Sequence, residues 1–255
     1  MRPVPGWTVI TAGTAPVLLV GGWTVAALLL GSGYDPATDT ISTLASVGEP
    51  YRWLMTAAIA GLGVCHVATA VGLRAAPLVG RIALAGAGVS AIVLALSPEP
   101  HGGVSLQHGT VVAVGFALMA VWPPLAARRG PTAPWVLRPR VVLVVTLLVL
   151  AGAAWFLVEL RGHGLAGVAE RALCAVQTLW PLVVVASCRH RLAARLYGTT
   201  RPVPPRLGRL LAGAAVDGLA QQIGVTVVAG VLLDHVEVHP TQRVLLLTAA
   251  EGVVQ

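Results

Sequence analysis

Polar side chains that could do chemistry lie around the ends of long apolar runs in this chain. Carboxylate, imidazole and hydroxyl groups follow the first run, flank the start of the fourth and surround the junction of the fifth and sixth. We predict that these groups form one polar site. Its candidate binding residues are Asp35, Asp39, Ser42, His101, His108, Glu159, Glu170, Arg171 and Gln177.

One chemistry open to these residue types is metal-dependent hydrolysis of a lipid or lipid-linked substrate. Imidazole and carboxylate groups bind zinc, and an open coordination position activates water. The candidate ligands are Asp39, His101, His108 and His163. Glu159 or Glu170 would then act as the base. No His-x-x-x-His or His-Glu-x-x-His motif fixes two ligands on one helical face, so the sequence requires no cofactor and leaves open whether the protein is an enzyme.

The chemistry that we favour is binding or passage of a lipid or small molecule. Four residues of the last apolar run are spaced by four, three and four positions and so share one helical face. They are Glu170, Cys174, Gln177 and Pro181. An ionisable group within a span usually faces the bundle interior or a water-filled cavity, so we expect this stripe to point inward and Arg171 to pair with Glu170 or Asp39. We expect His66, in the middle of the second run, to hydrogen bond a neighbouring helix.

The elements that must position these residues are six apolar runs. The chain has 255 residues, of which 56% are hydrophobic and 11% charged, and its mean hydropathy is +0.82. A soluble domain carries about 25% charged residues. Runs of roughly 20 apolar residues cross a bilayer as helices, so we predict an all-α, multi-pass membrane bundle. The predicted spans are about 8–31, 53–73, 78–96, 106–126, 141–160 and 166–188.

Arginine indicates the orientation, because the chain contains no lysine. The arginines gather in the two-three link, the four-five link and the segment after the sixth run, whereas the other links are richer in acid. The positive-inside rule then predicts that both termini are cytoplasmic, that the protein lies in the cell membrane and that the candidate site is on the outer face. The net charge of +7 is mostly this arginine. We therefore expect membrane lipids as partners and no nucleic acid.

The link after the first run carries helix-start signals. Asp35 is a candidate N-cap, and Pro36 would occupy the first helical position. The apolar face of this short amphipathic helix would carry Ile41, Leu44 and Val47. We expect the helix to lie on or dip into the outer surface, with Asp39 and Ser42 on its polar side.

The stretch 34–44, Tyr-Asp-Pro-x-x-Asp-Thr-Ile-Ser-x-Leu, resembles the hallmark of a prokaryotic integral-membrane family known as domain of unknown function 998. A later pattern of His108-Gly109, Glu170-Arg171 and Gln177 with Trp180 is similar too. The resemblance covers about residues 8–192. It implies a compact multi-helix membrane bundle and no established reaction.

The chain divides into a predicted transmembrane domain, 1–192, and a cytoplasmic extension, 193–255. The extension has a proline-rich start and could hold a membrane-surface helix, and an alternative is that 210–233 forms a seventh span. Small residues repeat every four positions in the second and third runs. They are Ala57, Gly61 and Cys65, and then Ala83, Ala87, Ala91 and Ala95. We expect them to pack these two helices together, with a homo-oligomer seam as the alternative.

Overall fold

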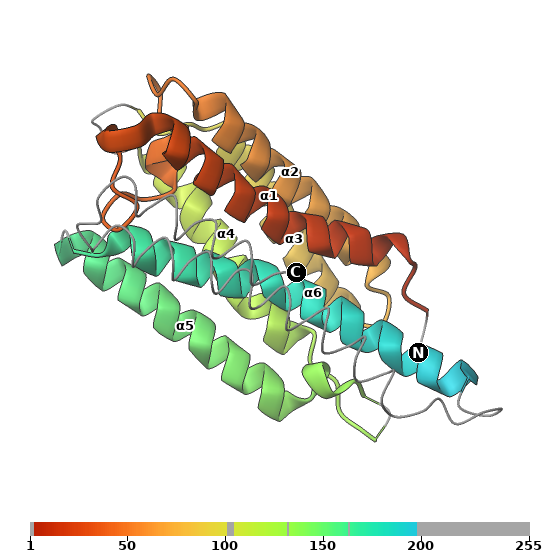
Figure 1. Cartoon of the computed structure of the whole chain (residues 1–255). Helices are drawn as coiled ribbons and strands as arrows, with labels where there is room; N and C mark the ends of the chain where they lie inside the picture. The colour runs from red at the N-terminus through yellow and green to blue at the C-terminus, as the bar shows by residue number, and fades with distance from the viewer. Residues whose placement is uncertain (1–2, 101–104, 132, 163, 198–255) are drawn as a thin grey trace, which may run out of the picture. The chain divides into compact units, whose positions relative to one another are not determined.

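Six long α-helices dominate the computed structural model, which describes residues 3–100, 105–131, 133–162 and 164–197. They are α1 (Trp7–Leu30), α2 (Arg52–Gly72), α3 (Leu78–Ala95), α4 (Leu106–Leu125), α5 (Pro139–Gly162) and α6 (Ala166–Tyr197), joined in part by the short 3-10 turns η1 (Gly31–Gly33), η2 (Ser42–Ala45) and η3 (Trp135–Leu137) (Figure 1). Each long helix contains a segment long and apolar enough to cross a membrane. The predicted six-helix membrane bundle is therefore confirmed. The predicted ends lie within about two residues of the observed ones, except that α6 continues past residue 188 to Tyr197.

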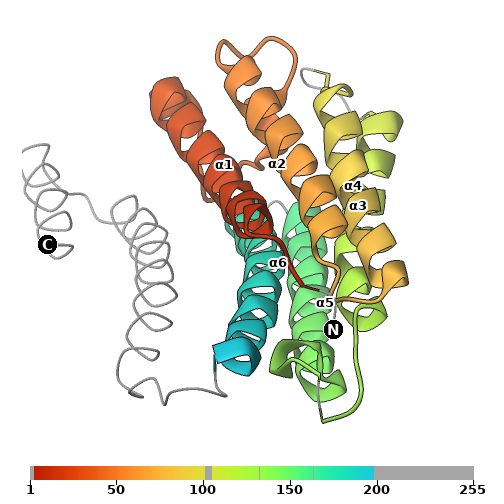
Figure 2. The same cartoon turned by 90° about the vertical axis from the view of Figure 1, so that its right-hand side faces the viewer.

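Successive helices run in opposite directions, so the bundle has two distinct ends (Figure 2). At one end, which we call the arginine end, Arg189 Nη1 donates to the Gly6 carbonyl oxygen at 3.3 Å and so joins α6 to the start of α1. The links 73–77, 126–131 and 133–138 lie at this end, where Ala75, Ala126 and Val136 share a core cluster with Cys188. At the other end, the loop end, the segment 34–51 meets the start of α6 and the segment after α3. Which end faces the cytoplasm stays a prediction.

Helices α2 and α3 approach closely where two glycines face each other. A Cβ atom added at Gly63 would lie 2.5 Å from the Gly88 carbonyl oxygen, and one added at Gly88 would lie 2.6 Å from that of Gly63. Such contact between small residues is a main source of helix association in lipid. Ala83 and Ala87 are buried as expected, but Gly61 faces Leu18 of α1. Of the predicted stripe on α2, Gly61 therefore packs against α1 rather than α3, although α2 and α3 do pack together as expected. The homo-oligomer seam stays a prediction.

Helix α5 lies at one side of the bundle, beside α6 (Figure 1). Only 17% of its membrane-spanning segment is buried. The buried face, which includes Val145, Val149 and Phe156, packs against residues of α4 and α6 such as Ala120 and Leu173. The remaining face exposes leucine and valine side chains, as a helix in contact with lipid acyl chains should.

The link after α1 differs from its prediction. Instead of one amphipathic helix it forms a turn at 35–39 and the single 3-10 turn η2. The Asp35 carboxylate accepts from Ala37 N at 2.9 Å, the Asp39 carboxylate accepts from Asp35 N at 2.9 Å, and Ile41 N donates to Glu170 of α6. Because these side chains bind the backbone donors, a continuous helix is not formed. Ile41 and Leu44 are buried, but Val47 is 42% exposed and does not share their face.

Several predictions fall outside the described residues. Two of the candidate site histidines, His101 and His163, belong to this group, as does the tail from 198 onward with its possible seventh span. The predicted domain boundary at residue 192 falls within α6.

Candidate functional site

Arg171, in the second turn of α6, fastens the 34–40 segment to the bundle. Its Nη1 atom donates to the carbonyl oxygens of Pro36 at 2.8 Å, of Asp39 at 3.1 Å and of Gly167 at 2.9 Å. Its Nη2 atom donates to the Tyr34 hydroxyl. The planar guanidinium presents several donors in a fixed fork, which suits it to gather carbonyl oxygens from different segments. The expected partners, Glu170 or the Asp39 carboxylate, are not the acceptors of these bonds.

Two aromatic rings flank the same guanidinium. The Arg171 Cζ atom lies 5.9 Å from the centroid of the Trp23 ring and 5.6 Å from that of Tyr34, within cation–π range. Burial raises the pKa of Tyr34 to about 12, although the nearby Arg171 charge lowers it. The phenol therefore stays protonated at neutral pH and donates to the Thr40 carbonyl oxygen at 3.0 Å while it accepts from Arg171.

Glu170 lies next to Arg171 but points elsewhere. It is 5% exposed, and its Oε2 atom accepts from Ile41 N at 2.6 Å. Gly167, one turn earlier, has no room for a side chain, because a Cβ atom there would overlap the carbonyl oxygens of Pro36 and Asp39. The start of α6 and the 34–41 segment thus fit together closely, which sets the Glu170 carboxyl group at the loop end of the bundle interior.

His108, in the first turn of α4, makes a second connection to the same segment. Its Nδ1 atom lies 2.9 Å from the Ser97 carbonyl oxygen, and its Nε2 atom lies 3.2 Å from Ser42 Oγ. A carbonyl can only accept, so we assign the proton of the neutral ring to Nδ1, and Nε2 then accepts from the Ser42 hydroxyl. Ser105 caps the helix by accepting from His108 N at 3.2 Å. His108 is therefore buried and fully engaged.

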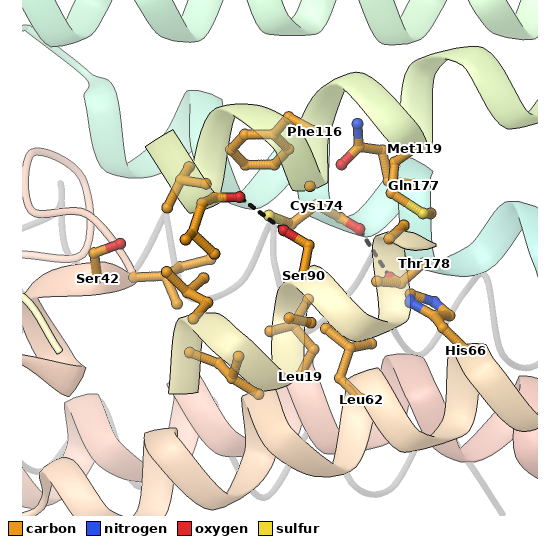
Figure 3. A pocket seen from close by; sticks show the side chains of 18 of the residues that line it. Leu19, Ser42, Leu62, His66, Ser90, Phe116, Met119, Cys174, Gln177 and Thr178 are labelled. Atoms are coloured by element: carbon orange, nitrogen blue, oxygen red, sulfur yellow. Dashed lines mark hydrogen bonds between the residues drawn. The ribbon is translucent and has the colours of Figure 1, made fainter. Parts of the chain in front are cut away.

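A cavity of about 110 Å³ lies inside the bundle, below these connections (Figure 3). Residues of α1, α2, α3, α4 and α6 line it, together with Ile41 and Ser42 from the link. Much of its wall is apolar, with side chains such as Leu62 and Phe116. Its polar lining is Ser42, His66, Ser90, Glu170, Gln177 and Thr178. The cavity is therefore an apolar chamber with polar groups at selected points, which is typical of small-molecule sites.

Two residues that line this cavity each contain a polar atom with no hydrogen-bond partner among the described residues. These atoms are Nε2 of His66 and Nε2 of Gln177. The two side chains are only 3% and 4% exposed. The expectation that His66 bonds a neighbouring helix is thus wrong for its Nε2 atom. Figure 3 shows both side chains in the same part of the pocket, near Thr178 and Met119. A buried polar atom without a partner costs roughly 1–3 kcal/mol, so such a pair needs an explanation.

The structure separates the other candidate residues from the cavity. Asp35 is exposed, and its carboxylate stabilises its own turn through Ala37 N and the Thr38 hydroxyl. Glu159 stabilises the α5–α6 junction, because its carboxylate accepts from Trp155 Nε1 at 3.0 Å and from Leu165 N at 2.8 Å. Asp39 reaches the cluster through its carbonyl oxygen rather than its carboxylate. These three carboxylates therefore serve local structure.

A metal site finds no support in the described part of the chain. There, no group of three or more His, Cys, Asp or Glu side chains is placed to hold a metal ion. Of the four candidate ligands, Asp39 and His108 are described. Asp39 Oδ2 accepts from Asp35 N, and the two ring nitrogens of His108 lie within hydrogen-bond distance of Ser97 and Ser42. The other two candidates lie outside the described residues.

Sequence reasoning missed two polar groups of the cavity and the role of one aromatic residue. Ser90 Oγ donates to the Val111 carbonyl oxygen at 2.8 Å, and Thr178 Oγ1 donates to that of Cys174 at 2.8 Å (Figure 3). The signal for Ser90 was present, because it follows the buried Ala83 and Ala87 at helical spacing. Tyr34 begins the stretch that resembles the family, and only its contact with Arg171, far away in the sequence, shows its structural role.

Comparison with known proteins agrees with this architecture. A family model described as "Protein of unknown function (DUF998)" matches residues 14–187, which include all six spans in whole or in large part. The resemblance noted in the sequence is therefore confirmed. No curated protein and no solved structure matches the chain.

Proposed function

The chain belongs to the DUF998 family, and we propose that it binds a small polar molecule in the cavity of its helix bundle. One observation carries this proposal: His66 and Gln177, which line the same cavity as Glu170, each contain a buried nitrogen atom with no partner among the described residues. A ligand, or the water that it displaces, would satisfy these atoms and remove their desolvation cost.

The size of the cavity limits the ligand. A dry cavity of about 150 Å³ in another protein holds benzene, so about 110 Å³ suits a molecule of about six non-hydrogen atoms or fewer. A whole lipid is far too large. Of the ligand classes that the sequence left open, we therefore propose the small molecule and regard lipids as the solvent of the outer helix faces.

The chemistry of the wall indicates what the ligand must offer. The Gln177 amide nitrogen can only donate, so the ligand should present an acceptor there. The Glu170 carboxyl group favours a donor at the loop end, and an amine or ammonium group would suit its ionised form. The apolar side chains between them favour a short hydrocarbon body. A small amine, amide or alcohol with polar groups at two ends meets these conditions.

Access from outside the cell is part of the proposal. The arginine distribution supports a cell-membrane protein with a cytoplasmic arginine end, which would place the loop end and Glu170 toward the exterior. The cavity would then be loaded from the outer face. The metal-dependent hydrolase stays a prediction to which the described residues add no support.

Native mass spectrometry of the full chain from nanodiscs tests the proposal. We expect the wild type to carry a retained mass well below that of a lipid. Gln177→Leu should lose it, because leucine fills a similar volume without the amide donor. Gln107→Leu is the matched control, since Gln107 donates to Ser97 at 3.2 Å and does not line the cavity. A wild type that carries lipids only, or a Gln177→Leu variant that retains the small ligand, contradicts the proposal.

A further inference from the structure

Buried polar side chains extend along the bundle beyond the cavity. Helix α6 places Glu170 near the loop end and Gln177 seven residues further along, about 10 Å deeper at the helical rise of about 1.5 Å per residue. His66 follows the start of α2 by fourteen residues, about 21 Å from the loop end by the same measure. Glu170 and the pair formed by His66 and Gln177 therefore lie at different depths of one cavity.

Further polar side chains lie between His66 and the arginine end of the bundle. Thr69, one turn further along α2, has its hydroxyl 2.9 Å from that of Thr11 in α1. Thr8, one turn closer to the start of α1, is fully buried, and its Oγ1 atom has no partner among the described residues. A Cβ atom added at Gly72, the last residue of α2, would overlap that same oxygen. Three buried or partly buried hydroxyl groups thus lie between the middle of the bundle and the arginine end, and those of Thr69 and Thr11 are within hydrogen-bond distance of each other.

The cavity can hold the water that would connect these groups. A water molecule needs a cavity volume of about 10–15 Å³ and two to four polar partners, so about 110 Å³ accommodates several. Glu170 is four residues into α6, about 6 Å from the loop end, so a chain from it to the depth of His66 covers about 15 Å and needs about five molecules at hydrogen-bond spacing of roughly 2.8 Å. The hydroxyls of Ser90 and Thr178 each donate to a backbone carbonyl and keep their lone pairs free to accept from such water.

We propose that the bundle conducts protons between its two ends. A proton leaves the Glu170 carboxyl group as its O–H bond breaks and forms a new O–H bond on the first cavity water. Each water passes on a different proton, and the last one forms an N–H bond at Nε2 of His66. The neutral acid and neutral imidazole thereby become carboxylate and imidazolium. Release of the other ring proton from Nδ1 toward the Thr69 and Thr11 hydroxyls leaves the remaining proton on Nε2. A flip of the imidazole ring that again turns a nitrogen without hydrogen toward the cavity, rotation of the two hydroxyls and uptake of a proton by Glu170 then complete the cycle without any oxidant or reductant.

The charged surroundings of the two groups differ. Arg171 and Glu99 are the charges whose fields reach Glu170, and the thiol of Cys174 lies beside it on the cavity wall. Around His66 the described lining of the cavity contains no other titratable group than Glu170 and Cys174. The path therefore has a charged entrance at the loop end and a neutral middle. An ionisable group in such a position within a membrane bundle commonly marks a proton or ion pathway.

The test is proton flux into liposomes that contain the purified full chain and an internal pH dye, with the membrane potential clamped. Wild type should equilibrate an imposed pH gradient several-fold faster than protein-free vesicles. Glu170→Gln and His66→Gln should reduce the protein-dependent rate at least tenfold, because glutamine keeps hydrogen bonding but does not titrate. Glu159→Gln is the matched control and should leave the rate unchanged. A wild type no faster than empty vesicles, or full flux in both variants, overturns the proposal.

Infrared difference spectra of the wild type between two pH values provide a second test that needs no variant to fold. A carboxyl and an imidazole band should titrate together in the folded protein, whereas a carboxyl band that changes alone overturns the relay. The inference shares its cavity with the proposed function but needs the cavity filled with water, so the flux assay uses ligand-free protein. The two proposals can be refuted independently. Native mass spectrometry reports ligand binding, and the internal pH of the liposomes reports proton movement.

Discussion

The loop end and the middle of the bundle differ in whether their buried polar side chains have hydrogen-bond partners. At the loop end, Arg171 donates to three carbonyl oxygens and the Tyr34 hydroxyl, and His108 engages both ring nitrogens. In the middle, His66 and Gln177 leave a nitrogen without a partner among the described residues. The difference separates side chains that hold the structure from side chains that are available to bind something else.

Energetics support this distinction. A hydrogen bond to a charged group contributes about 1.5–3 kcal/mol, whereas a buried polar atom left unpaired costs roughly 1–3 kcal/mol. The loop end should therefore stabilise the fold and the middle should destabilise it. Proteins retain such destabilising groups at functional sites, where stability is exchanged for activity. Three substitutions test the comparison, and we take them from the largest expected effect on stability to the smallest.

Replacement of Arg171 should lower the free energy of unfolding most. Arg171→Met keeps the unbranched apolar part of the side chain but removes every donor, which leaves the carbonyl oxygens of Pro36 and Asp39 without this partner. We expect the free energy of unfolding in detergent to fall by about 3 kcal/mol. Arg171→Lys should restore little of the loss, because an ammonium group does not reproduce the planar fork. Unfolding that is unchanged in Arg171→Met would show that the loop end does not hold the structure.

The site was predictable from the sequence where its geometry is local. The spacing of Glu170, Cys174 and Gln177 predicted a shared face of α6, and all three side chains line the cavity. The conformation of the 34–51 link was not predictable, because its helix donors are bound by groups that include Glu170, which is 129 positions away in the sequence from Ile41. The spacing of residues within the link cannot show that a side chain so distant in the sequence competes for its backbone donors. For the same reason, the pattern of α2 could not show that His66 Nε2 lacks a partner, since that depends on what every neighbouring helix offers.

Replacement of Gly167 should lower the free energy of unfolding by an intermediate amount. In Gly167→Ala the new methyl group must displace the carbonyl oxygens of Pro36 and Asp39, which are backbone atoms that cannot rotate away. We expect a loss of about 1–3 kcal/mol, typical of forced overpacking. Gly162→Ala is the matched control, because a Cβ atom there meets nothing within 4 Å, and its stability should be unchanged or slightly higher. Thermal unfolding followed by tryptophan fluorescence compares the two variants, and equal midpoints would contradict the close fit of α6 against the link.

Replacement of Gln177 should change the free energy of unfolding least, and should raise it rather than lower it. Gln177→Leu removes an amide nitrogen that has no partner among the described residues and replaces it with an apolar group of similar volume in a largely apolar chamber. The free energy of unfolding of the ligand-free variant should therefore equal that of the ligand-free wild type or exceed it by up to about 1 kcal/mol, because an unpaired buried donor is lost. The measurement needs both proteins free of ligand, since a bound molecule would stabilise only the wild type by mass action. A loss as large as that of Arg171→Met would mean that Gln177 holds the fold together, and the division between a structural loop end and an available middle would then fail.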